Sequence, residues 1–434
     1  MTSNYDLKPL TQVCEVLSGG TPKTTVPEFW NGNIPWASVK DFNIDSRWFS
    51  KTEKSISQLG LDSCSSVLLE PGDLVISARG TVGVVGQCKM RTSFNQSNYG
   101  LRAKSALSKN DYLYYALSYA KRALIGDTHG GMFDTITRDT LDRLLIPVPT
   151  LKVQEQIAEI LGSLDMKIAV NNALSKTLEI IAQTIFKSWF IDFDPVKAKM
   201  AGEKPAGMEA ATAELFPDSM EESELGVIPQ GWEWKSIGDI AHVIDCLHSK
   251  KPQLLSEGFP YLQLDTISDS GVLYFENAGR ISKEDYEKWT SRIEVEGGDC
   301  LITNVGRVGA ISQVPRHFKA AIGRNITAIR PKDSRLHQSF LIVSLLSDFM
   351  KREISNKTDS GTILEALNVK NIPKLLIPGP STELLLEFAK VCDPIQSQIQ
   401  ELHAINVNLR KIRDSLLPRL ISGELQIPEE MLAS

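Results

Sequence analysis

Two carboxylates and a lysine form the pattern that comes closest to catalytic chemistry in this chain. Pro217-Asp218 is followed by Glu233-Trp-Lys235, which fits the loose PD…ExK arrangement of nucleases, in which two carboxylates hold a metal ion and a lysine assists. That chemistry needs the ExK residues on a buried strand, whereas here they span an acidic segment and the start of a domain. We therefore favour a chance match and keep a metal-dependent nuclease as an alternative hypothesis.

The other residue types that could do chemistry are scattered. The six histidines form no metal-ligand spacing, and His242 and His248 lie six residues apart, which is not one helical face. The six cysteines contain no CxxC and indicate reduced thiols in a cytosolic protein. No phosphate loop of the GxxxxGK[ST] kind and no methyltransferase motif is present. The sequence therefore predicts no catalytic site, no cofactor and no metal.

The distribution of charge is more informative than its total. The 434-residue chain has a formal net charge of −6, but Gly202–Glu233 carries eight acidic residues and one basic residue, so the rest sums to +1. Gln87–Lys109 carries five Lys or Arg and no acidic residue, and Pro315–Arg335 carries six against Asp333 alone. Each basic stretch falls in the same part of one of two similar halves of the chain. A short basic stretch is usually a solvated surface strand, but two copies in register add support for a surface that faces nucleic-acid phosphates.

The chain is internally duplicated. Leu144–Pro149 reads LLIPVP and Leu375–Pro380 reads LLIPGP, and each precedes a long apolar heptad pattern. Eight of ten seam positions are apolar in each copy, at a constant offset of 231. The heptads predict two long helices that pack on each other, antiparallel if the domains lie at opposite ends. The seams are Ile157, Leu161, Leu164, Ile168, Asn171, Ser175, Leu178, Ala182, Ile185 and Trp189, and Phe388, Cys392, Ile395, Ile399, Leu402, Asn406, Leu409, Arg413, Leu416 and Leu420.

The limits of these helices can be predicted from capping and breaking residues. The first, Leu151–Asp192, would be roughly 60 Å long at 1.5 Å per residue and should end before Asp194-Pro195. The second should start near Ser381, kink or restart at Asp393-Pro394, and end near Ser422-Gly423. Asn171 and Asn406 occupy equivalent seam positions, where a polar residue either fixes the register or marks drift of the seam to the surface.

Each half also repeats a pattern of turns and strands. Pro71-Gly-Asp73 matches Gly297-Gly-Asp299, and Gly80 and Gly83 match Gly306 and Gly309. We expect an α+β fold with a mostly antiparallel or mixed sheet in each of two similar globular domains, separated by the pair of long antiparallel helices in a pseudo-twofold internal repeat. The expected strands are Val67–Leu69, Leu74–Ser77, Val82–Val85, Cys300–Thr303, Val308–Ser312 and Ile326–Ile329, with amphipathic helices at Asp111–Ile125 and Leu336–Ile354.

Several longer strings resemble a known family. Leu178–Pro195, Leu215-Phe-Pro-Asp218 with Gly231-Trp232, and Arg413–Gly423 look like the central and C-terminal regions of the specificity subunit of type I DNA restriction–modification enzymes. Ser18-Gly-Gly-Thr-Pro22 is similar to the start of many of its target-recognition domains. The resemblance covers essentially the whole chain. The second half departs from it, with Cys246-Leu-His248 where SGGTP would stand and Tyr261 in place of Trp36, which puts that domain's sequence preference in doubt.

The resemblance implies a non-catalytic role. Each target-recognition domain would read one half of a bipartite, asymmetric site on double-stranded DNA, and the helices would set the spacing. Two modification subunits would dock on the helices and methylate adenine N6 with S-adenosylmethionine, and restriction subunits would add ATP-driven translocation and cleavage. The absence of a signal pattern and of a long apolar run favours a cytoplasmic location and no membrane partner. A two-domain scaffold that binds protein or glycan is the remaining alternative.

The expected domains and base-reading residues can now be stated. The domains are 1–149 and 231–380 for target recognition, 150–194 and 381–423 for the long helices, 195–230 for an extended acidic crossover linker, and 424–434 for a tail. Base edges are read by Arg, Lys, Asn, Gln and Thr from polar loops beside strands, and for each candidate the competing role is phosphate contact or plain exposure at the surface. The candidates are Lys40, Arg79, Thr81, Asn95, Gln96, Arg307, Arg324, Asn325 and Thr362.

Overall fold

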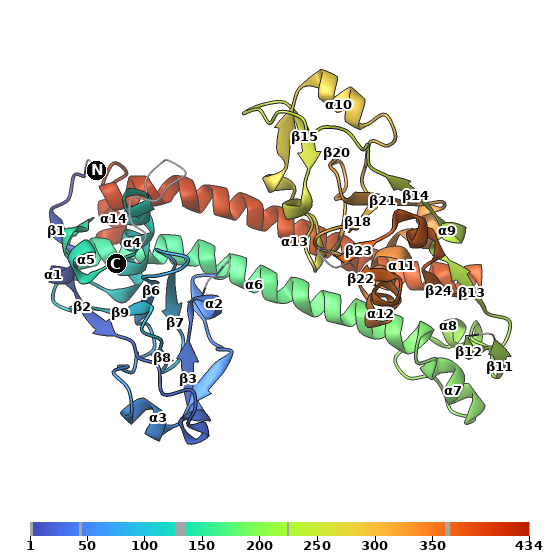
Figure 1. Ribbon diagram of the computed structural model, residues 1–434, viewed down its shortest axis with the longest axis horizontal. Helices are drawn as coiled ribbons and strands as arrows, with labels where there is room; N and C mark the ends of the chain where they lie inside the picture. Colours follow the sequence, from blue (N-terminus) through green and yellow to red (C-terminus); the bar gives the residue numbers. More distant parts are fainter. Residues whose placement is uncertain (1–2, 43–45, 126–134, 224, 361–364, 434) are drawn as a thin grey trace. The chain divides into compact units, whose positions relative to one another are not determined.

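The chain folds as two compact units. The computed structural model describes residues 3–42, 46–125, 135–223, 225–360 and 365–433. Unit 1 comprises Met1–Val170 and Asn406–Ser434, and unit 2 comprises Asn171–Ile405 (Figure 1). Each unit therefore contains one α+β domain together with part of both long helices.

Unit 1 is built on a five-stranded sheet and a three-stranded sheet. The five strands lie in the order β2-β9-β6-β7-β4, antiparallel except for the parallel β4–β7 pair. The three strands lie in the order β5-β3-β8, with β3 and β8 parallel, and β1 pairs with β10. The bounds are β1 (Leu7–Pro9), β2 (Cys14–Ser18), β3 (Trp30–Ala37), β4 (Trp48–Phe49), β5 (Lys54–Ile56), β6 (Leu74–Ser77), β7 (Val85–Cys88), β8 (Ser93–Phe94), β9 (Asn98–Ala103) and β10 (Leu145–Pro147).

Each strand described in unit 1 has a counterpart in unit 2, which also contains the antiparallel hairpin β22–β23. Its sheets have the orders β14-β21-β18-β19-β16 and β17-β15-β20, with β13 pairing β24, and the parallel pairs again fall at the same two places. The predicted duplication and mixed sheets are confirmed. The bounds are β13 (Glu233–Ser236), β14 (Ala241–Asp245), β15 (Phe259–Leu262), β16 (Gly271–Val272), β17 (Gly279–Ile281), β18 (Cys300–Thr303), β19 (Ile311–Gln313), β20 (Ala321–Ile322), β21 (Ile326–Pro331), β22 (Thr358–Ser360), β23 (Glu365–Leu367) and β24 (Leu376–Gly379).

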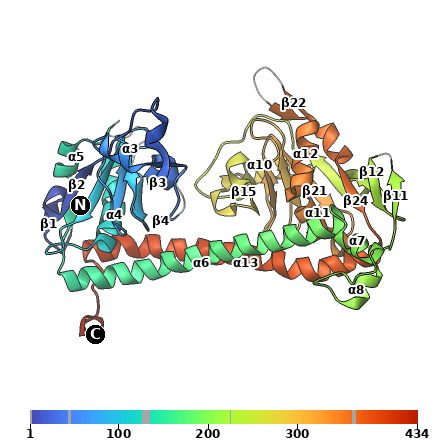
Figure 2. The same cartoon turned by 90° about the horizontal axis from the view of Figure 1, so that it is seen from below.

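Short helices cover these sheets, and one of the two predicted domain helices is divided. In unit 1, α4 (Asn110–Ile125) matches the prediction. In unit 2 the single predicted helix is divided into two helices, because the backbone of Ser347 is extended. The Ser347 hydroxyl caps the start of the second helix by accepting a hydrogen bond from the Met350 amide at 3.1 Å. Figure 2 shows the two pieces, α11 and α12, in unit 2. The other helices are α1 (Leu10–Val13), α2 (Val39–Phe42), α3 (Gln58–Asp62), α5 (Arg138–Arg143), α9 (Ile237–Ile240), α10 (Lys283–Trp289), α11 (Ser334–Leu346), α12 (Asp348–Asn356) and α14 (Glu429–Ala433), with 3₁₀ turns at Pro27–Phe29, Leu264–Thr266, Phe275–Asn277 and Val369–Lys374.

The two long helices are α6 (Leu151–Phe190) and α13 (Thr382–Ser422). They pack antiparallel within each unit. In unit 1, Leu161 shares a buried core with Leu420 and Ile421. In unit 2, the ring centroids of Phe190 and Phe388 lie 5.1 Å apart. No helix in the described residues is both long and apolar enough to cross a membrane.

The predicted seams are confirmed by burial, including their polar positions. Asn171 and Asn406 are each only 1% exposed. They are therefore true seam residues, and drift of the seam to the surface is the wrong explanation. A buried amide within an apolar seam restricts the registers in which two helices can pack.

Two features of the helices and their connection differ from the prediction. The α-helix continues through Pro394, where a break was expected, and the Asp393 carboxylate beside it accepts a hydrogen bond from the Ser339 hydroxyl. The segment 195–230 is not extended, because Phe216 and Ile228 bury their side chains in the core of unit 2. It forms α7 (Asp194–Met200), α8 (Ala210–Glu214) and the hairpin β11 (Met220–Ser223) and β12 (Gly226–Pro229).

Candidate nucleic-acid interface

In unit 1, three segments that are distant in the sequence meet at Ala78. The Ala78 amide donates to the Ser97 carbonyl at 2.8 Å, and the Ala78 carbonyl accepts from the Ile136 amide at 2.9 Å. The loop that follows β6 turns back through Gly80 and Gly83, whose φ angles of 77° and 79° suit glycine. The domain thus gathers loops from β6–β7, β8–β9 and the segment before α5 at one point.

Unit 2 builds the same junction at Asn304. The Asn304 amide donates to the Asn325 carbonyl at 3.0 Å, and the Asn304 carbonyl accepts from the Leu367 amide at 2.9 Å. Gly306 and Gly309 repeat the left-handed turns, with φ of 84° and 80°. The backbone frame is therefore shared between the units.

The loop after β6 and its counterpart after β18 are closed by the same side-chain clamp. The Ser77 hydroxyl donates to the Thr81 carbonyl, and the Thr303 hydroxyl donates to the Arg307 carbonyl. Thr81 and Arg307 thus stand at the same place on the same loop. One frame presents a different hydrogen-bonding side chain in each unit, which is the chemical requirement for reading two different base sequences.

Four of the five residues predicted to contact DNA in unit 1 are exposed. The Gln96 side-chain oxygen accepts from the Thr21 hydroxyl, which joins the β8–β9 loop to the loop after β2. Asn95 is half-buried, and its side-chain oxygen already accepts from the Ser97 amide at 3.2 Å and the Asn98 side-chain amide at 2.6 Å. Asn95 therefore shapes the loop. The exposed residues are Lys40, Arg79, Thr81 and Gln96.

In unit 2 the candidates also divide into occupied and open side chains. Arg307 pairs with Asp269 at 2.5 Å and donates to the Ile267 carbonyl at 2.7 Å. Asn325 adopts a left-handed φ of 68° and is half-buried, whereas Arg324 beside it is exposed. The remaining candidate, Thr362, lies outside the described residues.

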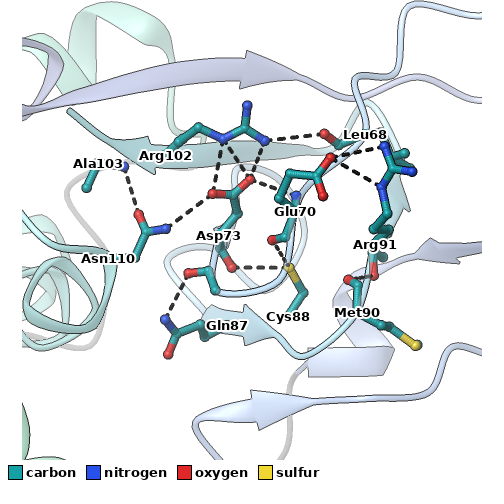
Figure 3. Close-up of polar contacts among 12 residues, drawn as sticks. Leu68, Glu70, Asp73, Gln87, Cys88, Met90, Arg91, Arg102, Ala103 and Asn110 are labelled. Carbon is teal, nitrogen blue, oxygen red and sulfur yellow. Dashed lines mark hydrogen bonds and ion pairs between the residues drawn. The ribbon is translucent and has the colours of Figure 1, made fainter. Parts of the chain in front are cut away.

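An Asp–Arg pair with a buried carboxylate lies at the start of the strand that leads into each frame. Asp73 binds Arg102 at 2.5 Å, accepts from the Glu70 amide at 2.9 Å and accepts from the Asn110 side chain at 3.2 Å (Figure 3). Hydrogen bonding to Asp73 raises the pKa of Arg102. Unit 2 repeats the arrangement with Asp299 and Arg330 at 2.6 Å and the Glu296 amide at 2.9 Å. The aspartates of the PGD and GGD turns are therefore structural.

These pairs change the interpretation of the two basic stretches. Besides Arg102 and Arg330, Arg91 binds Glu70 at 3.1 Å, Lys109 binds Glu155 at 2.7 Å and Lys319 binds Glu294 at 3.1 Å. Much of the positive charge that the sequence places in register is thus neutralised within its own unit. Several exposed cations form no ion pair among the described residues, including Lys40, Arg316, Arg79 and Arg324. Arg79 and Arg324 are the two that lie in the loops of the duplicated frame.

The sequence did not single out several residues that the fold brings to this region. Thr21 contacts Gln96, and Arg138 donates to the Ser18 hydroxyl at 3.0 Å. In unit 2, His248 lies beside Asp245 and Cys246, although no metal spacing was recognised among the histidines. The available signal was positional, since Thr21 lies in the SGGTP segment and His248 lies where that segment would stand in the second half, whereas nothing in the sequence pointed to Arg138.

The residues of the nuclease pattern do not form a catalytic site. Asp218 and Glu233 are both exposed. Glu233 lies on β13, which among the described residues pairs with β24 alone in a two-stranded sheet, so the buried strand that the chemistry needs is not provided there.

Comparisons with known proteins agree with this geometry. The chain matches the family described as Type I restriction modification DNA specificity domain over residues 2–180 and 229–405, one match for each copy of the repeat. It is 27% identical over 436 residues to the Type I restriction enzyme MjaIX specificity subunit of Methanocaldococcus jannaschii, covering 98% of this chain and 94% of that protein. It is 28% identical over 347 residues to the HindI specificity subunit of Haemophilus influenzae, covering 70% and 73%.

The fold also has a solved relative. The crystal structure of a type I restriction–modification system S subunit from M. genitalium superposes with a TM-score of 0.54 at 16% identity, and 96% of each chain is covered. At that identity the likeness shows the fold.

Proposed function

The chain belongs to the family of type I restriction–modification DNA specificity domains, and we propose that each of its two α+β domains reads one half of a bipartite, asymmetric DNA site. The observation that carries this proposal is the duplicated loop frame at Ala78 and Asn304, which holds the same backbone and presents different polar side chains. Shared geometry with different donors and acceptors suits two half-sites of different sequence.

The chain supplies recognition, and its partners supply chemistry. Two modification subunits docked on α6 and α13 would bring S-adenosylmethionine and methylate one adenine N6 in each half-site, and restriction subunits would add translocation and cleavage. The complex would act on DNA in the cytoplasm. The long helices would fix the distance between the half-sites. Residues 1–149 and 231–380 serve as the recognition domains in this scheme.

Individual residues take separate roles. Ser97 and Asn325 occupy equivalent loop positions, because their carbonyls accept from Ala78 and Asn304. Gln96 and Arg324 directly precede them, and we assign these two side chains to base edges. Lys40, on α2, and Arg79, in the β6–β7 loop, are exposed and positively charged, so we assign them to phosphates. Thr81 and Arg307 are secondary candidates for base contact.

Methylome sequencing tests the function directly. The chain is co-expressed with its modification subunits in a host without other adenine methylation. One bipartite motif with methyladenine in both halves is expected, and a genome without such a motif refutes the proposal. Exchange of residues 1–149 for another recognition domain should change one half of the motif only, and a change in both halves would overturn the assignment of one domain to each half.

Single substitutions test the residue roles. Arg324→Ala should relax one base position in a single half-site, at a discrimination of about 1–3 kcal/mol for a lost bidentate contact. Arg316→Ala is the matched control, since it removes an exposed cation from the same stretch. If both variants weaken methylation equally at every base, Arg324 contacts phosphate and not a base edge.

A further inference from the structure

Three potential metal ligands cluster where β14 ends in unit 2. One donor atom each from Asp245, Cys246 and His248 lies within 4.8 Å of the other two. His248 Nε2 is 2.7 Å from Asp245 Oδ2. Cysteine sulfur, histidine nitrogen and carboxylate oxygen together are a ligand set that Zn²⁺ accepts.

The internal repeat shows what stands at these positions in the other copy. The antiparallel register pairs β2 with β9 as it pairs β14 with β21, so the residue that ends β2 corresponds to the one that ends β14. Three positions that hold weak or no metal ligands in unit 1 therefore hold strong ones in unit 2. The corresponding pairs are Ser18 with Asp245, Gly19 with Cys246, and Thr21 with His248.

The corresponding position in unit 1 has no room for a side chain. A Cβ atom on Gly19 would lie 2.1 Å from the Asn95 carbonyl oxygen, so unit 1 excludes any side chain at this point. In unit 2 the residue equivalent to Asn95 is Gly323, and the two amides make equivalent hydrogen bonds, to the Ala37 carbonyl at 3.1 Å and to the Leu262 carbonyl at 2.8 Å. The backbone of unit 2 nevertheless leaves room for the Cys246 side chain, which is buried.

The surroundings of the cluster suit a cation. Cys246 is 1% exposed, and Asp245 Oδ1 is buried without a hydrogen-bond partner among the described residues. Arg292 donates to the Cys246 carbonyl at 2.9 Å and stands 4.0 Å from Asp245 Oδ2, so it offsets only part of the negative charge. The His248 side chain is 60% exposed, which leaves the cluster open to solvent on that side.

Backbone donors also face the sulfur of the cluster. The amides of Asn325 and Ile326 are placed to donate to the Cys246 sulfur, and they would stabilise a metal-bound thiolate. Zinc binds cysteine as the thiolate, so the thiol proton would pass to solvent when the ion binds.

We propose that Asp245, Cys246 and His248 bind one Zn²⁺ ion through a carboxylate oxygen, the thiolate sulfur and an imidazole nitrogen, with solvent in the fourth position. Tetrahedral ligands around zinc lie about 3.3–3.7 Å from one another, given bond lengths of about 2.0–2.3 Å. The present donors need to move by about an ångström to reach that spacing. The ion would hold the end of β14 and the residues that follow it in one arrangement.

Cobalt titration of the purified full chain tests the site without any DNA substrate or partner. One equivalent of Co²⁺ should produce a thiolate-to-cobalt charge-transfer absorption, and Zn²⁺ should displace it. His248→Ala should lower the affinity for Co²⁺ by more than roughly 10–100-fold, which is the usual loss when a residue that only hydrogen-bonds to a metal ligand is replaced. Because His248 is exposed, this variant should fold, as far-ultraviolet circular dichroism will report.

Two cysteine variants complete the design. Cys246→Ser should abolish the absorption, and Cys64→Ser, which changes a half-buried thiol in unit 1, should leave it intact. Absence of the absorption in the unaltered chain overturns the proposal, as does equal binding by the His248→Ala variant. Since the readout is metal binding alone, failure here leaves the DNA-recognition proposal unaffected.

Discussion

Replacing the buried Asp165 of unit 1 with alanine should weaken the packing of the first domain against both long helices. Asp165 on α6 is 6% exposed, and it accepts from the Tyr115 hydroxyl on α4 and from Arg413 on α13, each at 2.6 Å. Arg47 extends the chain of contacts by donating to the Tyr115 hydroxyl at 3.2 Å. Four segments of unit 1 therefore depend on one side chain.

The size of the effect follows from burial. Loss of one partner from a buried ion pair destabilises by about 3–5 kcal/mol. Arg413 retains 27% of its side-chain exposure and a second partner, Asp414 at 2.8 Å, so we expect the lower part of that range for Asp165→Ala. Tyr115→Phe removes a hydrogen bond to a charged group and should lower the free energy of unfolding by about 1.5–3 kcal/mol.

A double-mutant cycle provides the measurement. Urea unfolding of Asp165→Ala, Arg413→Ala and the double variant should give a coupling energy of about 1–3 kcal/mol between the two sites. The transition of unit 1 should move, while that of unit 2 stays in place. Strictly additive effects, or an equal shift in unit 2, would refute the reasoning that this carboxylate joins the domain to the helices.

Three further predictions concern other parts of the chain. Gly19→Ala should displace the Asn95 loop and reduce methylation of the first half-site, as methylome sequencing would report. The control is Gly202→Ala, because a Cβ at Gly202 would meet no atom within 4 Å. This variant should lower the free energy of unfolding by only about 1 kcal/mol and leave the methylated motif unchanged. Asp299→Ala should destabilise unit 2 by about 3–5 kcal/mol in denaturant unfolding, with unit 1 unaffected. Burial lowers the pKa of His337, so the native state binds a proton less readily than the unfolded chain. The free energy of unfolding should therefore fall as the pH decreases below about 6.5. Urea unfolding should show that the His337→Gln variant loses less stability between about pH 7.5 and 5.5 than the unaltered chain.

The long-range plan of the fold was accessible from the sequence because it rests on periodicity. The heptads predict α6 and α13 to within two residues at most ends, and the repeated turn and strand strings predict β6, β18 and β21. Local boundaries were less accessible where backbone geometry overrides composition. The apolar run Val82–Val85 suggested a strand, but Gly80 and Gly83 turn the chain back, so β7 begins only at Val85.

The candidate site was predictable in its position and less so in its chemistry. The sequence indicates polar loops beside strands, and most of the chosen residues lie there. It does not reveal which cations are neutralised, because Arg102 and Asp73 are 29 residues apart and meet only through the sheet register. It also does not reveal that the Asn95 side chain is committed to its own loop, since that depends on a turn three residues long.

The narrow space at Gly19 has a consequence for inheritance. The Asn95 backbone carbonyl that closes it lies more than seventy residues further along the chain, whereas the equivalent position in unit 2, Cys246, carries a buried side chain. A crossover that fell between these segments and brought a cysteine to position 19 would set its Cβ against that carbonyl. New specificities should therefore spread through exchange of whole domains, with breakpoints outside the segments that must fit each other.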